Sequence, residues 1–345
     1  MRTTKHRAVW DTWGNSTAAE RLHRAVEQGP RHAYLLTGPH HIGKSHVALR
    51  FAASLLCRST ERSGEFCGGC STCRRVLKGV HPDVTRFDLE WQASQDEGGS
   101  KNLSLNIKTV REIGRHVSLR PAESNWRVVV VDDVETMQEP AQEAFLKTLE
   151  EPPSYVVLLM LATDAELLLP TILSRCAIVP MVPATDALVT EALLDAGANE
   201  ADAERIAVAV RGRVGLGLRA VEDASLLETL SEHVSEAVRW VGGDPYERMA
   251  EAYRLAEGFT SDREMVFDRV AAVEAAWREL MLSAHGVETI ARHPVHHVGR
   301  LRGPDEGVAA LRSIDRCVRD LEANVRPRLA IGTMVAAWPK LEAPS

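Results

Sequence analysis

A glycine-bearing segment near the N-terminus has the residue types and spacing of a phosphate-binding loop. The pattern G-x-x-x-x-G-K-[ST] is matched in full by Gly38, Pro39, His40, His41, Ile42, Gly43, Lys44 and Ser45. Its glycines allow a backbone that directs N–H groups at phosphate oxygens, and a helix starting here would add its positive end. We expect Lys44 to reach the β- and γ-phosphates of ATP and Ser45 to ligate Mg²⁺.

Two aspartates follow the most apolar segment of the chain, the valine run Val128–Val131. An ATPase with a phosphate-binding loop needs a carboxylate near Mg²⁺ at the end of a neighbouring strand, and Asp132 is placed for that role. The next residue, Asp133, is a candidate for orienting the attacking water. Capping of the following turn is the alternative for both aspartates, and for Asp133 it is as well supported as catalysis.

A cysteine cluster follows the phosphate-binding loop, with the spacing Cys57-x9-Cys67-x2-Cys70-x2-Cys73. Two C-x-x-C steps suit a tetrahedral zinc ion, and four protein ligands would make the site structural because no open position remains. An iron–sulfur cluster and four unrelated buried cysteines are the alternatives. Cys176 and Cys317 stand alone and are expected to be ordinary small apolar residues.

Alternating strand and helix patterns surround these residues and predict a three-layer α/β domain with a parallel sheet. Strands are expected at 33–37, 83–89, 127–132, 155–163 and 177–181, and helices at 16–28, 44–57, 107–118, 139–151 and 167–174. The loop 38–45 then lies between a strand and a helix, which favours phosphate binding over a chance match in a turn. Polar residues 91–102 are expected to form an exposed loop.

After Pro183 the pattern becomes helical throughout. Short amphipathic segments at 186–194, 202–210 and 217–221 precede a longer helical region from 224 to about 341. The sequence therefore predicts three domains: an α/β nucleotide-binding domain (1–183) with an inserted four-cysteine module (57–73), a small helical domain (184–223) and a helical C-terminal domain (224–345).

Composition excludes several classes of protein. The chain has 345 residues, of which 45% are hydrophobic and 26% charged, with a formal net charge of −7. That charge argues against binding DNA by bulk electrostatics, and no run approaches the ~20 apolar residues that span a bilayer. The start lacks the apolar segment of a secretory signal, so a cytoplasmic protein is expected.

Several motifs together resemble the bacterial clamp-loader family of DNA polymerase III, and its delta-prime branch in particular. The resemblance is close over about 10–220 and looser in the helical remainder. Besides the cysteine module, it is carried by the runs His32–Gly38, His81–Asp83, Glu143–Pro153 (EAFLKTLEEPP), Leu169–Cys176 (LPTILSRC) and Asn324–Ala330 (NVRPRLA).

This resemblance implies a RecA-like AAA+ domain (1–183), a helical lid (184–223) and a collar (224–345) that holds a hetero-pentamer together. Partners would be gamma or tau motor subunits, delta, the sliding clamp and, through the complex, primer–template DNA. Within the Ser-Arg-Cys run, Arg175 would be an arginine finger acting on a neighbour's ATP, an ordinary salt-bridged arginine being the alternative. Thr163 would be the sensor-1 residue, or else a strand-end cap.

Two departures from the motor subunits favour the delta-prime stator, a subunit that binds ATP with weak or no hydrolysis. Motor subunits carry glutamate where this chain has Asp133, and a lid arginine where it has Gly215; Arg213 and Arg219 lack the family spacing. An active gamma-type ATPase and an unrelated AAA+ switch ATPase are the alternatives. No nucleotidyl-transfer chemistry is visible, so polymerisation would belong to partner chains.

Overall fold

The computed structural model describes residues 10, 12–59, 65–95, 104–287 and 295–343. The chain divides into two compact units, Met1–Val221 and Glu222–Ser345.

Unit 1 is built around a five-stranded, entirely parallel sheet, as the sequence predicted. Its order is β2-β3-β4-β1-β5, so the first strand lies between the fourth and the fifth. Because all strands run the same way, the loops after β1, β3 and β4 emerge at one edge of the sheet. The strands are β1 (Ala33–Thr37), β2 (Val84–Phe87), β3 (Arg127–Val131), β4 (Val156–Ala162) and β5 (Ala177–Pro180).

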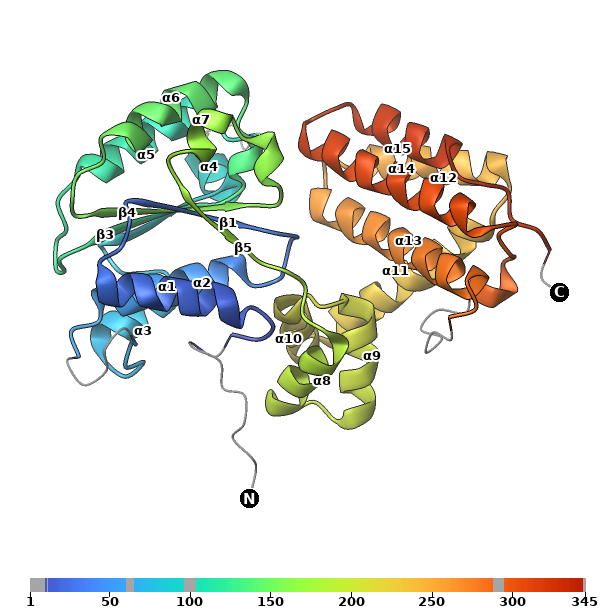
Figure 1. Cartoon of the computed structure of the whole chain (residues 1–345), viewed down its shortest axis with the longest axis horizontal. Coiled ribbons are helices and arrows are strands. Elements are labelled where there is room, and N and C mark those ends of the chain that lie inside the picture. Colours follow the sequence, from blue (N-terminus) through green and yellow to red (C-terminus); the bar gives the residue numbers. More distant parts are fainter. Residues whose placement is uncertain (1–9, 11, 60–64, 96–103, 288–294, 344–345) are drawn as a thin grey trace. The chain divides into compact units, whose positions relative to one another are not determined.

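Helices cover both faces of this sheet (Figure 1). The valine run is buried throughout, and its side chains alternate: Val128 and Val130 pack in the core under α1 (Ser16–Gln28) and α2 (Lys44–Leu56). Val129 and Val131 pack in the opposite core. The helices over that face are α5 (Ile107–Ser118) and α6 (Glu139–Glu150), while α3 (Ser71–Leu77), which contains Cys73, packs beside α2. The predicted three-layer α/β class is confirmed.

Two local predictions were wrong. Residues 91–95 are helical, within α4 (Leu89–Gln95), because the carboxylate of Asp88 accepts the Trp91 N–H at 2.7 Å and so caps the first turn. The rest of the predicted loop, 96–102, lies outside the described residues. Instead of one helix over 167–174 there are a 3₁₀ turn, η3 (Ala165–Leu167), and α7 (Pro170–Leu173). They are separated because Leu169 precedes a proline and is extended.

Three further helices, α8 (Asp186–Asp195), α9 (Glu200–Val210) and α10 (Val214–Glu222), lie where the small helical domain was predicted. The division into compact units keeps 184–221 with the sheet.

Unit 2 contains α11 (Ala224–Gly242), α12 (Pro245–Gly258), α13 (Arg263–Ala284), η4 (Val295–His297), α14 (Pro304–Glu322) and α15 (Pro327–Ala336). Its core is centred on Trp277, which is fully buried. The buried guanidinium of Arg248 lies over the rings of Trp277 and Trp338 and donates to the carbonyls of Val241 and Pro339. Within the described ranges, no helix combines the length and apolar character needed to cross a membrane.

Candidate functional site

The loop 38–45 joins the end of β1 to the start of α2. Gly38 has φ 141°, and a Cβ there would lie 2.3 Å from the carbonyl oxygen of Met181. Gly43 is left-handed, with φ 99°, and caps the start of α2. The two glycines therefore allow the chain to turn tightly between strand and helix, where a side chain would clash or be strained.

Lys44 is turned back onto this loop. The residue is 7% exposed, and Nζ donates to the carbonyls of Gly38 at 2.5 Å and Pro39 at 3.0 Å. Both acceptors belong to the loop itself, so the ammonium group of Lys44 lies against the backbone of 38–45.

Ser45 and Asp132 meet at the edge of the sheet. The Ser45 hydroxyl donates to Asp132 Oδ2 at 3.1 Å, which joins the start of α2 to the end of β3. A hydroxyl and a carboxylate oxygen form the donor pair that holds Mg²⁺ in phosphate-loop ATPases, so these residues fit the ion. The same Oδ2 also accepts from Arg86 Nη2 at 2.9 Å. Sequence reasoning missed Arg86, because its contact with Asp132 depends on the register between β2 and β3.

Asp133 begins a tight turn. Its backbone is left-handed (φ 54°), its N–H donates to Asp132 Oδ1 at 3.1 Å, and its carbonyl accepts from the Thr136 hydroxyl at 2.7 Å. The 3₁₀ turn η2 (Val134–Thr136) follows. These backbone contacts belong to the capping alternative, and the catalytic role of Asp133 stays a prediction.

Thr163, directly after β4, is bonded to an acid that the sequence did not single out. Glu135 is 6% exposed, and its Oε1 accepts both the Thr163 hydroxyl at 2.7 Å and the Thr163 N–H at 3.1 Å. Burial raises the pKa of the Glu135 carboxyl, against these bonds and the charge of Lys44. Nothing in the local sequence distinguishes this glutamate from a turn residue.

Gly215, at the start of α10, lies against the phosphate-binding loop. A Cβ built there would be 3.4 Å from the carbonyl oxygen of His41. The position expected to hold a lid arginine therefore faces the loop, but it carries no side chain. Arg213 Nε donates to the carbonyl of Val210 at 3.0 Å, across the turn between α9 and α10.

Arg175 lies in the turn between α7 and β5, with 34% of its side chain exposed. Its guanidinium pairs with Glu150 Oε1 at 2.9 Å and donates to the Thr171 carbonyl at 2.8 Å. These contacts hold it beside α6 and α7.

The four clustered cysteines converge. Their Sγ atoms all lie within 4.8 Å of one another, and those of Cys67 and Cys73 are 3.9 Å apart. Zn–S bonds of about 2.3 Å at a tetrahedral ion would place two sulfurs about 3.8 Å apart. The backbone N–H groups of Cys70 and Gly69 lower the pKa of the Cys67 thiol to about 6, whereas burial raises that of Cys73. The arrangement could hold one metal ion.

The isolated cysteines differ from this group. Burial raises the pKa of both Cys176 and Cys317 to about 12, so each remains a protonated thiol near neutrality.

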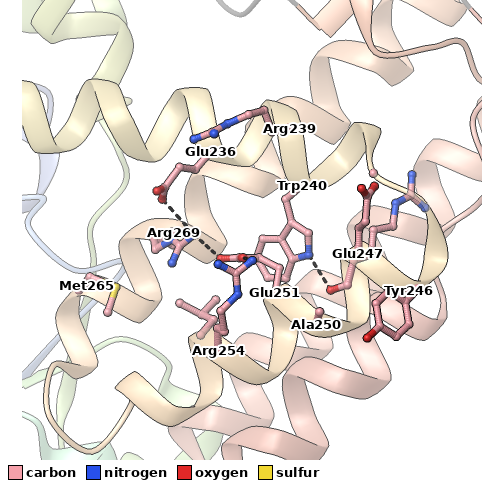
Figure 2. A pocket seen from close by; sticks show the side chains of 13 residues that line it. Glu236, Arg239, Trp240, Tyr246, Glu247, Ala250, Glu251, Arg254, Met265 and Arg269 are labelled. Carbon is pink, nitrogen blue, oxygen red and sulfur yellow. Dashed lines mark hydrogen bonds and ion pairs between the residues drawn. The ribbon is translucent and has the colours of Figure 1, made fainter.

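Unit 2 contains a cavity of about 580 Å³ at α11, α12 and α13 (Figure 2). Arg269 on α13 pairs with Glu236 of α11 at 2.9 Å and with Glu251 of α12 at 2.6 Å. The ion pairs thus connect the three helices.

Known proteins similar to this chain in sequence include subunits of DNA polymerase III. Residues 14–185 match the family described as DNA polymerase III, delta subunit. DNA polymerase III subunit delta' of Pseudomonas aeruginosa is 37% identical over 145 residues, which are 42% of this chain and 41% of that protein. Subunit tau of Escherichia coli is 34% identical over 145 residues, 42% of this chain and 20% of that protein. The aligned parts thus span less than half of these relatives.

Among solved structures, a DNA polymerase III gamma subunit-related protein from Thermotoga maritima is similar over 92% of this chain and 97% of its own. Its sequence identity is 18% and the TM-score is 0.43. A RuvB mutant from the same organism is similar over 69% of this chain and 78% of its own, with 13% identity and a TM-score of 0.43.

Proposed function

We propose that this chain, whose residues 14–185 belong to the clamp-loader subunit family of bacterial DNA polymerase III, is the delta-prime stator of a clamp loader. In this role it binds ATP with weak or no hydrolysis and supplies Arg175 to the ATP site of a neighbouring motor subunit. Membership of the family speaks against an unrelated AAA+ switch ATPase. It leaves the gamma-type motor as the alternative, since tau and delta' relatives match at comparable identity.

Nucleotide binding would use the whole loop. The N–H groups of 38–45 and the start of α2 would hold the phosphates, and Lys44 would leave the Gly38 and Pro39 carbonyls to bond them. Ser45 and Asp132 would hold Mg²⁺, which, when bound, neutralises charge on the phosphates.

Weak hydrolysis is supported above all by the position of Gly215. The glycine lies against His41 of the loop, so the lid brings no guanidinium to the phosphates at this point. Asp133 adds to this, because its side chain is one methylene shorter than the glutamate of the motor subunits, and a small misplacement is costly for in-line attack.

Arg175 would act in trans. Its guanidinium is permanently charged and can neutralise charge that develops on a transferred γ-phosphoryl group. To reach a neighbour it must leave Glu150, but both partners are partly exposed and such pairs contribute only about 0–1 kcal/mol. The pair with Glu150 thus orients Arg175 but is weak enough for the arginine to leave it. Thr163 would act as sensor 1, oriented by Glu135.

The cysteine module would hold a structural zinc ion. A separation of 4.8 Å or less among all four sulfurs fits a single central ion better than an iron–sulfur cluster, whose thiolates bind different iron atoms. The ion would fix the segment between α2 and α3.

Assembly follows from the same proposal. Unit 2 would form the collar of a hetero-pentamer with gamma or tau subunits and delta, and the complex would load the sliding clamp onto primed DNA. The chain itself, with a net charge of −7, would meet DNA only as part of the assembly.

Reconstitution tests the proposal. ATP turnover is measured for the chain alone and for the complex with motor subunits and delta, comparing wild type, Arg175→Ala and Lys44→Ala. We expect negligible turnover by the chain alone, a loss of about a thousandfold at the adjoining site with Arg175→Ala, and near-normal turnover with Lys44→Ala. Arg205→Ala, which removes an exposed arginine paired with Asp202, is the matched control.

The gamma-type alternative predicts the reverse. Robust turnover by the isolated chain that survives Arg175→Ala and disappears with Lys44→Ala would rule out the stator.

A further inference from the structure

Arg86 places a permanent positive charge on the carboxylate expected to hold Mg²⁺. Its Nη2 lies 2.9 Å from Asp132 Oδ2, the same oxygen that accepts the Ser45 hydroxyl. Its Nε lies 3.0 Å from Asp88 Oδ2, so one guanidinium bridges two carboxylates. The metal-binding oxygen is therefore already paired with a cation that belongs to the chain.

Strand register places Arg86 there. β2 and β3 are parallel, with Arg86 beside Val130, and Asp132 follows two residues later on the same face. The core clusters agree, since Val84 and Val130 pack on one side of the sheet while Phe87 and Val131 pack on the other. The contact therefore depends on the sheet and not on the setting of a surface loop.

Asp88 fixes the other end of the guanidinium. Its Oδ1 accepts the Trp91 N–H at 2.7 Å, which anchors the carboxylate at the start of α4, while Oδ2 holds Arg86. Arginine stays protonated at every accessible pH, and its planar fork suits two carboxylates at once.

We propose that Arg86 is the resident cation of this nucleotide site, so that a nucleoside triphosphate binds there with little dependence on a divalent cation. A divalent ion approaching Asp132 meets a guanidinium on the oxygen that it needs, and must share that oxygen or displace the arginine. The inference rests on the proposed function in one respect: loop 38–45 must bind a nucleotide. It also explains why the loop pattern is intact although Asp133 and Gly215 disfavour hydrolysis: in this arrangement ATP binding does not require the metal ion that hydrolysis requires.

Calorimetric titration of the full-length chain with ATP, in magnesium chloride and in EDTA, tests this inference. For wild type we expect the Kd for ATP to change by less than about threefold between the two conditions. For Arg86→Gln we expect ATP binding to be about tenfold or more weaker in EDTA than in magnesium chloride. Arg86→Lys keeps the charge but loses the fork that bridges Asp88 and Asp132, so its Kd in EDTA should lie between those of wild type and Arg86→Gln. Arg115→Gln, which removes an arginine paired with Glu112 on α5, is the matched control.

A second readout uses Mn²⁺ as the probe. Electron paramagnetic resonance of the ATP-bound chain should show tighter Mn²⁺ binding in Arg86→Gln than in wild type, because the competing charge is gone. Thermal unfolding of each variant checks that the fold is retained. If Arg86→Gln is unstable, Arg86→Lys carries the comparison, because its loss of the bridge should still make ATP binding in EDTA weaker than in wild type.

The outcomes separate the two proposals. Strong magnesium dependence in wild type, equal to that of Arg86→Gln, overturns the role of Arg86 while the nucleotide site stands. Absence of ATP binding by every variant in both conditions overturns the nucleotide site and this inference together. The trans action of Arg175 is measured separately in the reconstituted complex.

Discussion

Gly38→Ala should be far more damaging than the same substitution at Gly29. Both glycines have positive φ, 141° and 94°, so an alanine is strained at either position, by about 1–3 kcal/mol. They differ in their surroundings. A Cβ at Gly29 meets nothing within 4 Å, whereas at Gly38 it would lie 2.3 Å from the Met181 carbonyl oxygen.

Relief of that clash requires the loop and the end of β5 to move apart. Two backbone bonds are then at risk, Gly38 N–H to the Ala162 carbonyl (3.1 Å) and Met181 N–H to the Thr37 carbonyl (2.8 Å). Each buried group left unpaired costs about 1–3 kcal/mol, so we expect Gly38→Ala to lose about 4 kcal/mol more than Gly29→Ala. For a unit of this size the extra loss corresponds to roughly 8–16 °C in Tm.

Differential scanning calorimetry of the two variants measures this difference. ATP should raise the Tm of wild type and Gly29→Ala by mass action, but not that of Gly38→Ala, whose loop is displaced. Equal Tm values for the two variants, or an unchanged ATP effect in Gly38→Ala, would refute the inferred packing of the loop against β5.

Three further outcomes are expected. One metal ion should co-purify with the chain. Cys70→Ser should release the ion and lower the free energy of unfolding by more than about 4 kcal/mol, whereas the control Cys176→Ser should retain the ion. Metal analysis and calorimetry measure the two effects. Burial raises the folded pKa of Glu135, so its stabilising contribution is complete below the unfolded pKa and is lost as pH rises through the folded value. In urea unfolding from about pH 4 to about pH 8, the free energy of unfolding of Glu135→Gln should therefore rise relative to that of wild type as pH rises. A difference in unfolding free energy that stays constant with pH would contradict this. Arg248→Met leaves two carbonyls unpaired and should destabilise unit 2 by about 3 kcal/mol, whereas Arg254→Met, at an exposed position, should be nearly neutral by the same assay.

Local pattern was sufficient for much of the fold. The buried valine run, the loop between strand and helix and the helical character after Pro183 follow from hydrophobic period and from proline and glycine positions within short windows. The helix over 91–95 was missed because a single cap from Asp88, followed by Trp91 packing on Phe87, outweighed a polar composition.

The sequence by itself determined the G-x-x-x-x-G-K-S pattern of loop 38–45 and the metal-type cysteine spacing, because all residues of each are close neighbours along the chain. Only the tertiary structure decided three contacts: Arg86 with Asp132, Glu135 with Thr163, and Gly215 with His41. Each joins segments separated by more than twenty residues, and each depends on strand register or on how a helix meets the loop. Spacing along the sequence specifies neither the strand register nor the packing of a helix on the loop, and shifting a strand by one residue turns every side chain to the opposite face. The residue types of the loop could therefore be identified from the sequence, whereas the contact of the Arg86 guanidinium with Asp132 could be identified only from the pairing of β2 with β3.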